Sequence, residues 1–182
     1  PFDYEVSAIG VRSVDCNIAA YCLTHNENAG ANQRESRAPV EDDPLTVKAQ
    51  AYLSRMLDHL EYVGVLALEL FVVGDELLAN EFAPRVHNSG HWPSEGAATS
   101  QFANQLRAVT GAQQGSSAVV GHAGMVNLIG SSPDAARDAC IGALHDYGKS
   151  TRPGRKLGHI TVVAETASDR DAQTSALGKT VS

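Results

Sequence analysis

The sequence predicts an α+β fold, and three patterns support this prediction. Residues 5–12 alternate in polarity, as a strand does. Residues 44–62 repeat apolar side chains at the spacing of an α-helix. Residues 65–73 and 77–83 are apolar runs on either side of a Gly-Asp turn, which indicates a β-hairpin.

The other elements follow from turn signals and shorter apolar runs. A turn at 15–17 precedes a returning strand at 18–23, whereas residues 25–43 are polar without periodicity, which predicts a long loop. Toward the C-terminus the predicted elements are, in order, a helix from Thr99 or Ser100 to Gly111, a linker at 112–117, a strand at 119–129, a helix at 133–143, a short strand at 144–147, a basic loop at 148–158, a strand at 159–164 and a helix at 168–177.

Two of the predicted helices have an apolar face. The first helix begins with Asp43 as its N-cap and Pro44 in its first turn. Its apolar face consists of Val47, Ala51, Tyr52, Met56, Leu57 and Leu60. The helix that ends at Gly111 has a single apolar stripe, formed by Phe102, Leu106 and Val109.

Composition excludes several classes of function. The 182 residues carry 21 acidic and 14 basic side chains, a net charge of −7, whereas nucleic-acid-binding proteins are usually basic. No apolar run approaches the roughly 20 residues that span a bilayer. We therefore expect neither a nucleic-acid partner nor a membrane partner.

The cysteines and the first residues bear on where the protein works. Cys16, Cys22 and Cys140 are odd in number and lack paired spacing, which favours reduced thiols and a cytoplasmic location. The chain opens at Pro1 without an initiator Met and without a charged and apolar leader. We expect it to be a piece of a longer polypeptide that is not exported.

Two glutamates in the hairpin indicate a metal site. Glu69 lies within an apolar run, and Glu81 lies in the partner strand. A three-residue loop at 74–76 with a bulge would place these carboxylates opposite each other, whereas a two-residue turn would place Glu69 opposite Asn80. Opposed carboxylates repel, and Mg²⁺ between them would remove the repulsion. The alternative is two edge glutamates that reach water.

The loop after the hairpin concentrates polar side chains in Arg85, His87, Asn88, Ser89 and His91. The guanidinium of Arg85 suits a phosphate or a carboxylate. His87 is a candidate donor or base, or else a buried imidazole whose hydrogen bonds are satisfied. A zinc site at His87 and His91 fits their spacing but lacks further ligands nearby. The loop therefore predicts a pocket for an anionic ligand.

A second segment suits an anion. Four cations fall within eight residues at Lys149, Arg152, Arg155 and Lys156. The segment is either a solvated basic loop or a clamp for a phosphate. Together with the carboxylate pair, it suggests a nucleotide-using enzyme with a phosphorylated second substrate.

Four longer motifs identify a family that the chain resembles. They are Asn80-Glu81-x-Ala-Pro-Arg-x-His-Asn-Ser-Gly-His-Trp, Thr99-Ser-Gln-Phe-x-x-x-Leu-Arg-Ala, Met125-Val-Asn-Leu-Ile-Gly and Tyr147-Gly-Lys-x-x-Arg-Pro-Gly-Arg-Lys-x-Gly-His. In this order they resemble the N5-carboxyaminoimidazole ribonucleotide synthases, the ATP-grasp carboxylases of purine biosynthesis. The resemblance extends from about Phe2 to about Val163. It implies the C-terminal part of an ATP-grasp domain at 1–111, an antiparallel sheet with helices, and a small β-rich domain at 112–182.

The resemblance also implies a reaction and its ligands. ATP, Mg²⁺ and bicarbonate would carboxylate aminoimidazole ribonucleotide through carboxyphosphate, and members of the family tend to form homodimers. The implied ATP contacts are Glu5, Asn28, Asn80 and Glu81, and the implied Mg²⁺ ligands are Glu69 and Glu81. The implied catalytic residues are Arg85, His87 and Asn88, and the ribonucleotide would be bound by Arg85, Lys149, Arg155 and Lys156.

The chain departs from the family in two respects. Asn28 stands where the family usually has His, and residues 30–33 replace an Asp-Gly-Ile-Leu run. The family's N-terminal half, with its glycine-rich loop over the ATP phosphates, is absent. We therefore expect the chain alone to be inactive. A non-catalytic remnant and another ATP-grasp ligase remain as alternatives.

Overall fold

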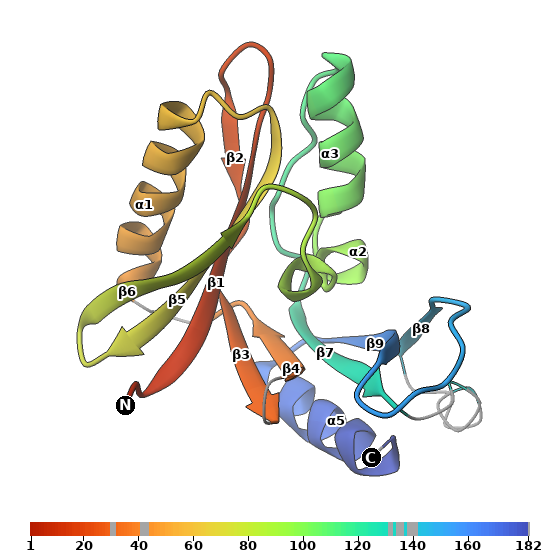
Figure 1. Ribbon diagram of the computed structural model, residues 1–182. Helices are drawn as coiled ribbons and strands as arrows, with labels where there is room; N and C mark the ends of the chain where they lie inside the picture. The colour runs from red at the N-terminus through yellow and green to blue at the C-terminus, as the bar shows by residue number, and fades with distance from the viewer. Residues whose placement is uncertain (30–31, 41–43, 131–132, 134–136, 138–141, 182) are drawn as a thin grey trace.

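The computed structural model shows a continuous antiparallel sheet flanked by helices, as the predicted α+β class requires (Figure 1). It describes residues 1–29, 32–40, 44–130, 133, 137 and 142–181. The helix predicted at 133–143 and Cys140 fall mainly or wholly outside these residues. None of the described helices combines the length and hydrophobicity needed to cross a membrane.

The strands and helices have the following bounds. The strands are β1 (Tyr4–Arg12), β2 (Ile18–Ala20), β3 (Thr24–Ala29), β4 (Asn32–Ala38), β5 (Gly64–Val73), β6 (Glu76–Ala83), β7 (His122–Ile129), β8 (Ala143–Asp146) and β9 (Lys156–Ala164). The helices are α1 (Leu45–His59), α2 (Pro93–Gly96), α3 (Gln101–Thr110) and α5 (Ala167–Thr180), with a 3₁₀ turn η1 (Asn88–Gly90).

The strand order is β6-β5-β1-β3-β4-β7-β9-β8, with β2 beside β1. Pairing of β4 with β7 carries the sheet through the predicted boundary at 111 and 112 without a break. The division into domains at 1–111 and 112–182 therefore stays a prediction.

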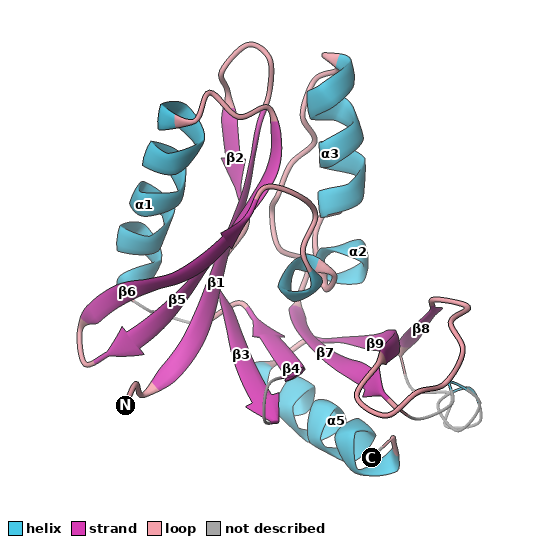
Figure 2. Cartoon of the chain, viewed as in Figure 1, coloured by secondary structure: helices cyan, strands magenta, loops and turns pink. Residues whose placement is uncertain are grey.

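Helices cover both faces of the sheet (Figure 2). On one face, α1 packs on β1 and β5, and on the other, α3 packs near the same strands. A third apolar cluster joins α5 to β7 and β9. Successive strand residues point to opposite faces, so the α1 side and the α3 side receive alternate residues of β5.

The buried face of α1 differs from the predicted one. It consists of Leu45, Ala49, Leu53 and Leu57, at a strict four-residue interval. Of the predicted face, Leu57 is buried and Tyr52 and Met56 are partly buried, whereas Val47 is 75% exposed, Leu60 is 48% exposed and Ala51 is also exposed.

The long loop predicted at 25–43 is wrong, because β3 and β4 occupy most of it. Their inward polar side chains satisfy one another across neighbouring strands. Asn26 Nδ2 donates to Ser7 Oγ at 2.7 Å, and Ser36 Oγ donates to Asn26 Oδ1 at 3.2 Å. All three residues are buried. A buried strand can be polar when its hydrogen bonds are met, and hydrophobic periodicity does not detect such a strand.

The ends predicted for α3 are confirmed, but its predicted apolar stripe does not face the core. The Ser100 side chain accepts from Ala103 N, and Gly111 ends the helix in the left-handed conformation. The stripe of Phe102, Leu106 and Val109 is exposed. The buried residues are instead Gln101, Asn104 and Ala108, so amide side chains dock this helix.

The burial of polar residues and the exposure of apolar residues on α3 lead to a prediction about stability. We expect Leu106→Ala to change the free energy of unfolding by about 0.5 kcal/mol or less, because Leu106 is 65% exposed. Gln101→Ala should destabilise by about 1–3 kcal/mol, because it leaves buried backbone groups of His87 unpaired. Urea unfolding of both variants measures this contrast, and a larger loss for Leu106→Ala would refute it.

Candidate active site

The hairpin brings the two glutamates together, as predicted. Glu69 on β5 pairs directly with Glu81 on β6. The predicted three-residue loop was wrong, because Val73 pairs with Glu76 and the turn therefore has two residues. The register shifts further along the hairpin instead, where Asn80 is the extra residue of a β-bulge. The bulge therefore creates the carboxylate pair.

Three carboxylates crowd this point of the sheet. Burial, followed by the charges of Glu5 and Glu81, raises the pKa of Glu69 to about 7. Burial also raises the pKa of Glu5, and a hydrogen bond from Asn28 partly opposes that shift. Asn28 Nδ2 donates to Glu5 Oε2 at 2.8 Å. The site therefore concentrates negative charge that the described side chains only partly offset.

This charge suits a cation. Oxygens of Glu69 and Glu81 and a ring nitrogen of His87 all lie within 4.8 Å of one another. His87 Nε2 is 3.5 Å from Glu69 Oε1. Carboxylate oxygens are the ligands that Mg²⁺ prefers, so the Glu69–Glu81 pair fits Mg²⁺, and His87 is a neighbour of Glu69. The zinc alternative at His87 and His91 finds no support, because the group of possible metal ligands found among the described residues joins His87 to Glu69 and Glu81 and does not contain His91.

Contacts to both the backbone and the ring of His87 hold this residue in place. Gln101 Oε1 accepts from His87 N at 3.0 Å, and Gln101 Nε2 donates to His87 O at 2.7 Å. Ser89 Oγ lies 2.9 Å from His87 Nδ1. Burial, with the nearby charges of Arg85 and Lys156, lowers the pKa of His87 to about 4. The ring is therefore neutral near pH 7, which suits a base or hydrogen-bond partner.

Lys156 reaches this cluster from β9, which lies toward the opposite edge of the sheet from β5 and β6. It was predicted in the basic loop, but it is the first residue of β9. Its Nζ donates to Asn88 Oδ1 at 2.9 Å. Burial lowers the pKa of Lys156, whereas the charge of Glu69 raises it. A half-buried ammonium thus lies within the electrostatic reach of the carboxylates.

The remaining candidates lie further out. Asn80 and Arg85 are exposed, and Arg85 Nη1 donates to the Val86 carbonyl at 3.0 Å. Lys149 Nζ lies 4.7 Å from the centroid of the Tyr147 ring. Arg155 Nη1 donates to Ser150 Oγ at 3.1 Å. Arg85, Lys149 and Arg155, called the rim cations below, make these contacts outside the carboxylate cluster.

Sequence reasoning assigned no role to Asn127, which forms a reciprocal amide pair with Asn88. Asn127 Nδ2 donates to Asn88 Oδ1 at 2.8 Å, and Asn88 Nδ2 donates to Asn127 Oδ1 at 2.9 Å. The available signal was a single amide in the apolar strand at 122–129. Gln101 was missed for a similar reason, because it is a single amide beside the apolar stripe of α3.

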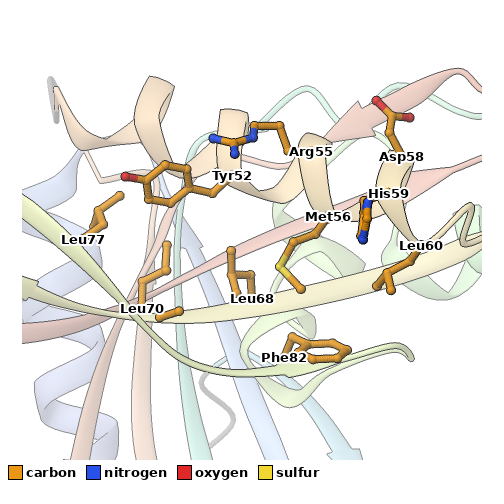
Figure 3. Close-up of a pocket in the computed structure, with 11 residues that line it drawn as sticks. Tyr52, Arg55, Met56, Asp58, His59, Leu60, Leu68, Leu70, Leu77 and Phe82 are labelled. Atoms are coloured by element: carbon orange, nitrogen blue, oxygen red, sulfur yellow. The ribbon is translucent and has the colours of Figure 1, made fainter.

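A cavity of about 810 Å³ lies elsewhere, between α1 and strands β5 and β6. Figure 3 shows Met56, Leu68, Leu70 and Phe82 around this hollow. It opens on the α1 side of the sheet, whereas Glu69 points to the other side. The cavity wall is chiefly apolar, so the chemistry belongs to the carboxylate cluster.

Two family models match the chain on either side of the α3 region. The ATP-grasp domain matches residues 1–102, and the phosphoribosylaminoimidazole carboxylase C-terminal domain matches residues 123–173. By these matches the chain belongs to the ATP-grasp family.

Among curated proteins, the chain is similar to N5-carboxyaminoimidazole ribonucleotide synthases. The synthase of Pseudomonas aeruginosa is 48% identical over 164 residues, which cover 89% of this chain and 45% of that protein. The synthase of Escherichia coli is 42% identical over 180 residues, covering 97% and 50%. The chain thus spans about half the length of the curated relatives it matches.

Solved structures agree with the fold. The synthetase of Thermus thermophilus has a TM-score of 0.94 and 48% identity, covering 100% of this chain and 52% of that one. The synthase of Aspergillus clavatus, solved with ADP and 5-aminoimidazole ribonucleotide, has a TM-score of 0.92 and 30% identity, covering 99% and 52%.

The raised pKa of Glu69 predicts how stability depends on pH. Between about pH 4.5 and about pH 7 the unfolded chain loses this proton while the folded chain keeps it. In the absence of a metal, stability should therefore fall across this window, by about 3 kcal/mol at most. Glu69→Gln should flatten this part of the profile, as measured by urea unfolding at several pH values.

The matched control is Glu165→Gln, because Glu165 is exposed and distant in sequence from the cluster. That variant should keep the wild-type pH profile. An unchanged slope in Glu69→Gln would show that Glu69 does not carry the effect.

Proposed function

We propose that the polypeptide containing this chain is an ATP-dependent carbon–nitrogen ligase. It would use ATP and bicarbonate to convert 5-aminoimidazole ribonucleotide into N5-carboxyaminoimidazole ribonucleotide, with ADP and phosphate as products and carboxyphosphate as the intermediate. The observation that carries the proposal is the Glu69–Glu81 pair beside His87 and Lys156. Mg²⁺-bound ATP would supply the phosphoryl group there.

The residues divide between two sides of the cluster. Glu69 and Glu81 would hold Mg²⁺, and the nearby Glu5, Asn28 and Asn80 would contact ATP. Asn28 is already engaged with Glu5 and offers an uncharged donor where the family usually has His. Its hydrogen bond keeps Glu5 in one orientation toward the nucleotide.

On the other side, Arg85, His87 and Asn88 would face the bicarbonate-derived group and the ribonucleotide. The neutral His87 ring brings no charge into the site before a proton transfer, and it becomes a cation when it accepts a proton. Arg85, Lys149 and Arg155, at the rim, would bind the ribonucleotide phosphate.

Lys156 was predicted to bind the same phosphate, but its position supports a second role. Its Nζ contacts Asn88 within the cluster, and its charge interacts with Glu69. A buried ammonium there would stabilise negative charge as carboxyphosphate forms.

Two further parts of the proposal concern the setting of the enzyme. Purine biosynthesis and the free thiols of Cys16 and Cys22 are consistent with a cytoplasmic location of the enzyme.

A homodimer is supported by the exposed apolar stripe of α3, which would be covered by a second copy. Light scattering of the purified chain measures that assembly.

A chimera tests the function. This chain would replace the matching segment of the Pseudomonas aeruginosa synthase, which retains the rest of its own sequence. We expect ribonucleotide-dependent ATP hydrolysis by the chimera and no turnover by the 182 residues alone, because they span only 45% of the length of that synthase. A folded but inactive chimera would favour a non-catalytic remnant, and activity with another acceptor would favour a different ATP-grasp ligase.

The rim cations lead to a prediction about ribonucleotide binding by the same chimera. Arg155→Ala should weaken ribonucleotide binding about tenfold or more, because a charge-assisted bond to the phosphate is lost. Arg55→Ala is the matched control, since Arg55 lies on α1 at the far side of the sheet. Calorimetric titration with the ribonucleotide gives both dissociation constants, and equal constants would remove Arg155 from the site.

A further inference from the structure

Two roles remain open for His87, that of a base and that of a hydrogen-bond donor. The role of a neutral imidazole depends on which of its two nitrogens carries the single proton. The nitrogen with the proton can only donate a hydrogen bond, and the other nitrogen can only accept one. The contacts between His87 and Ser89 decide between these two forms.

The backbone of Ser89 makes the decisive contact. Its N–H donates to His87 Nδ1 at 3.4 Å, and by this contact His87 caps the 3₁₀ turn η1. A backbone N–H can only donate, so Nδ1 must present a lone pair. Ser89 is fully buried, where an N–H without an acceptor would cost free energy.

The hydroxyl of Ser89 supports the same form of the ring. Its Oγ lies 2.9 Å from His87 Nδ1. A hydroxyl can rotate to donate or to accept, so it adapts to the lone pair on Nδ1 and donates to it. Because Nδ1 accepts these bonds, the ring is not the doubly protonated cation, and its single proton lies on Nε2.

This proton faces the carboxylate cluster. His87 Nε2 is 3.5 Å from Glu69 Oε1, and a ring nitrogen lies within 4.8 Å of oxygens of both Glu69 and Glu81. Two hydrogen bonds between Gln101 and the His87 backbone keep the ring at this place. A protonated Nε2 neither ligates a cation nor accepts a further proton, whereas it can donate a hydrogen bond to a negatively charged oxygen.

We propose that His87 acts as a hydrogen-bond donor to an anionic oxygen at the cluster rather than as a base, and that Ser89 is the positioning residue that keeps the proton on Nε2. This inference rests on the proposed function, in which carboxyphosphate is the anion that forms there. A fixed donor stabilises negative charge as it develops and needs no rearrangement during the reaction. Mg²⁺ would then be held by Glu69 and Glu81 without His87.

Nuclear magnetic resonance of the chain itself tests the position of the proton without any activity. Near neutral pH, the ¹⁵N shifts of His87 should show a proton on Nε2 and a lone pair on Nδ1, with and without millimolar Mg²⁺. Ser89→Ala should move the Nδ1 shift, because that nitrogen loses one of its two donors. A proton on Nδ1, loss of the Nε2 proton when Mg²⁺ is added, or an unchanged Nδ1 shift in Ser89→Ala would overturn the inference.

The matched control is Ser36→Ala, because Ser36 is equally buried and its hydroxyl donates to the side chain of Asn26. Urea unfolding should show a similar loss of stability in the two serine variants. The His87 shifts should move only in Ser89→Ala. A change of the same size in both variants would come from a general loosening of the fold and would also overturn the inference.

Two substitutions at His87 test the donor role in the chimera. His87→Gln places an amide N–H near the position of Nε2 but is no base, whereas His87→Asn places its amide near Nδ1. His87→Gln should keep kcat within about tenfold of the parent chimera. His87→Asn should lower kcat about a hundredfold, because the donor to the developing charge is removed.

An amide does not replace a base, so equal losses of kcat in the Gln and Asn variants would overturn the donor role while the proposed function stands. An inactive parent chimera would instead overturn the proposed function. The ¹⁵N shifts of His87 in the chain itself would then still decide whether Ser89 keeps the proton on Nε2.

Discussion

The arrangement of the site depends on Glu69, whose carboxylate is partly buried beside two other carboxylates, where its charge is unfavourable. Glu69 lies in the middle of a β-strand, and its burial, followed by the charges of Glu5 and Glu81, raises its pKa to about 7. Burying charge in this way costs free energy unless a cation or a proton compensates it. The partners gathered around Glu69 can be understood as responses to this constraint: the bulge that delivers Glu81, the neutral His87 and the half-buried Lys156.

Amide side chains hold these partners in position. Gln101 binds both backbone groups of His87, and Asn88 with Asn127 holds Lys156. Amides donate and accept at once, so they can join loops to strands without adding charge to a crowded site. This explains why α3 buries its polar residues and leaves its apolar stripe exposed. The helix is an anchor for the loop after the hairpin.

Local patterns were enough to predict much of the fold and most of the cluster. The hairpin was marked by two apolar runs, and α3 by Ser100 and Gly111. The pairing of Glu69 with Glu81 was anticipated, but through the wrong turn, because a bulge within β6 leaves no clear signal in polarity. The strands β3 and β4 were missed because Asn26 and Ser36 satisfy each other inside the sheet. The roles of Asn127 and Gln101 depend on partners 39 and 14 residues away, and spacing alone does not reveal such partners.

The central claim is that Glu69 and Glu81 form a Mg²⁺ site, and the carboxyl carbon of Glu69 reports on it directly. A ¹³C pH titration of the chain should show Glu69 ionising near pH 7 without metal. Millimolar Mg²⁺ should move that ionisation clearly lower, because a bound cation favours the charged form, while the exposed Glu165 stays unaffected. A Glu69 titration that begins near the ordinary glutamate value, or that does not respond to Mg²⁺, would contradict the claim.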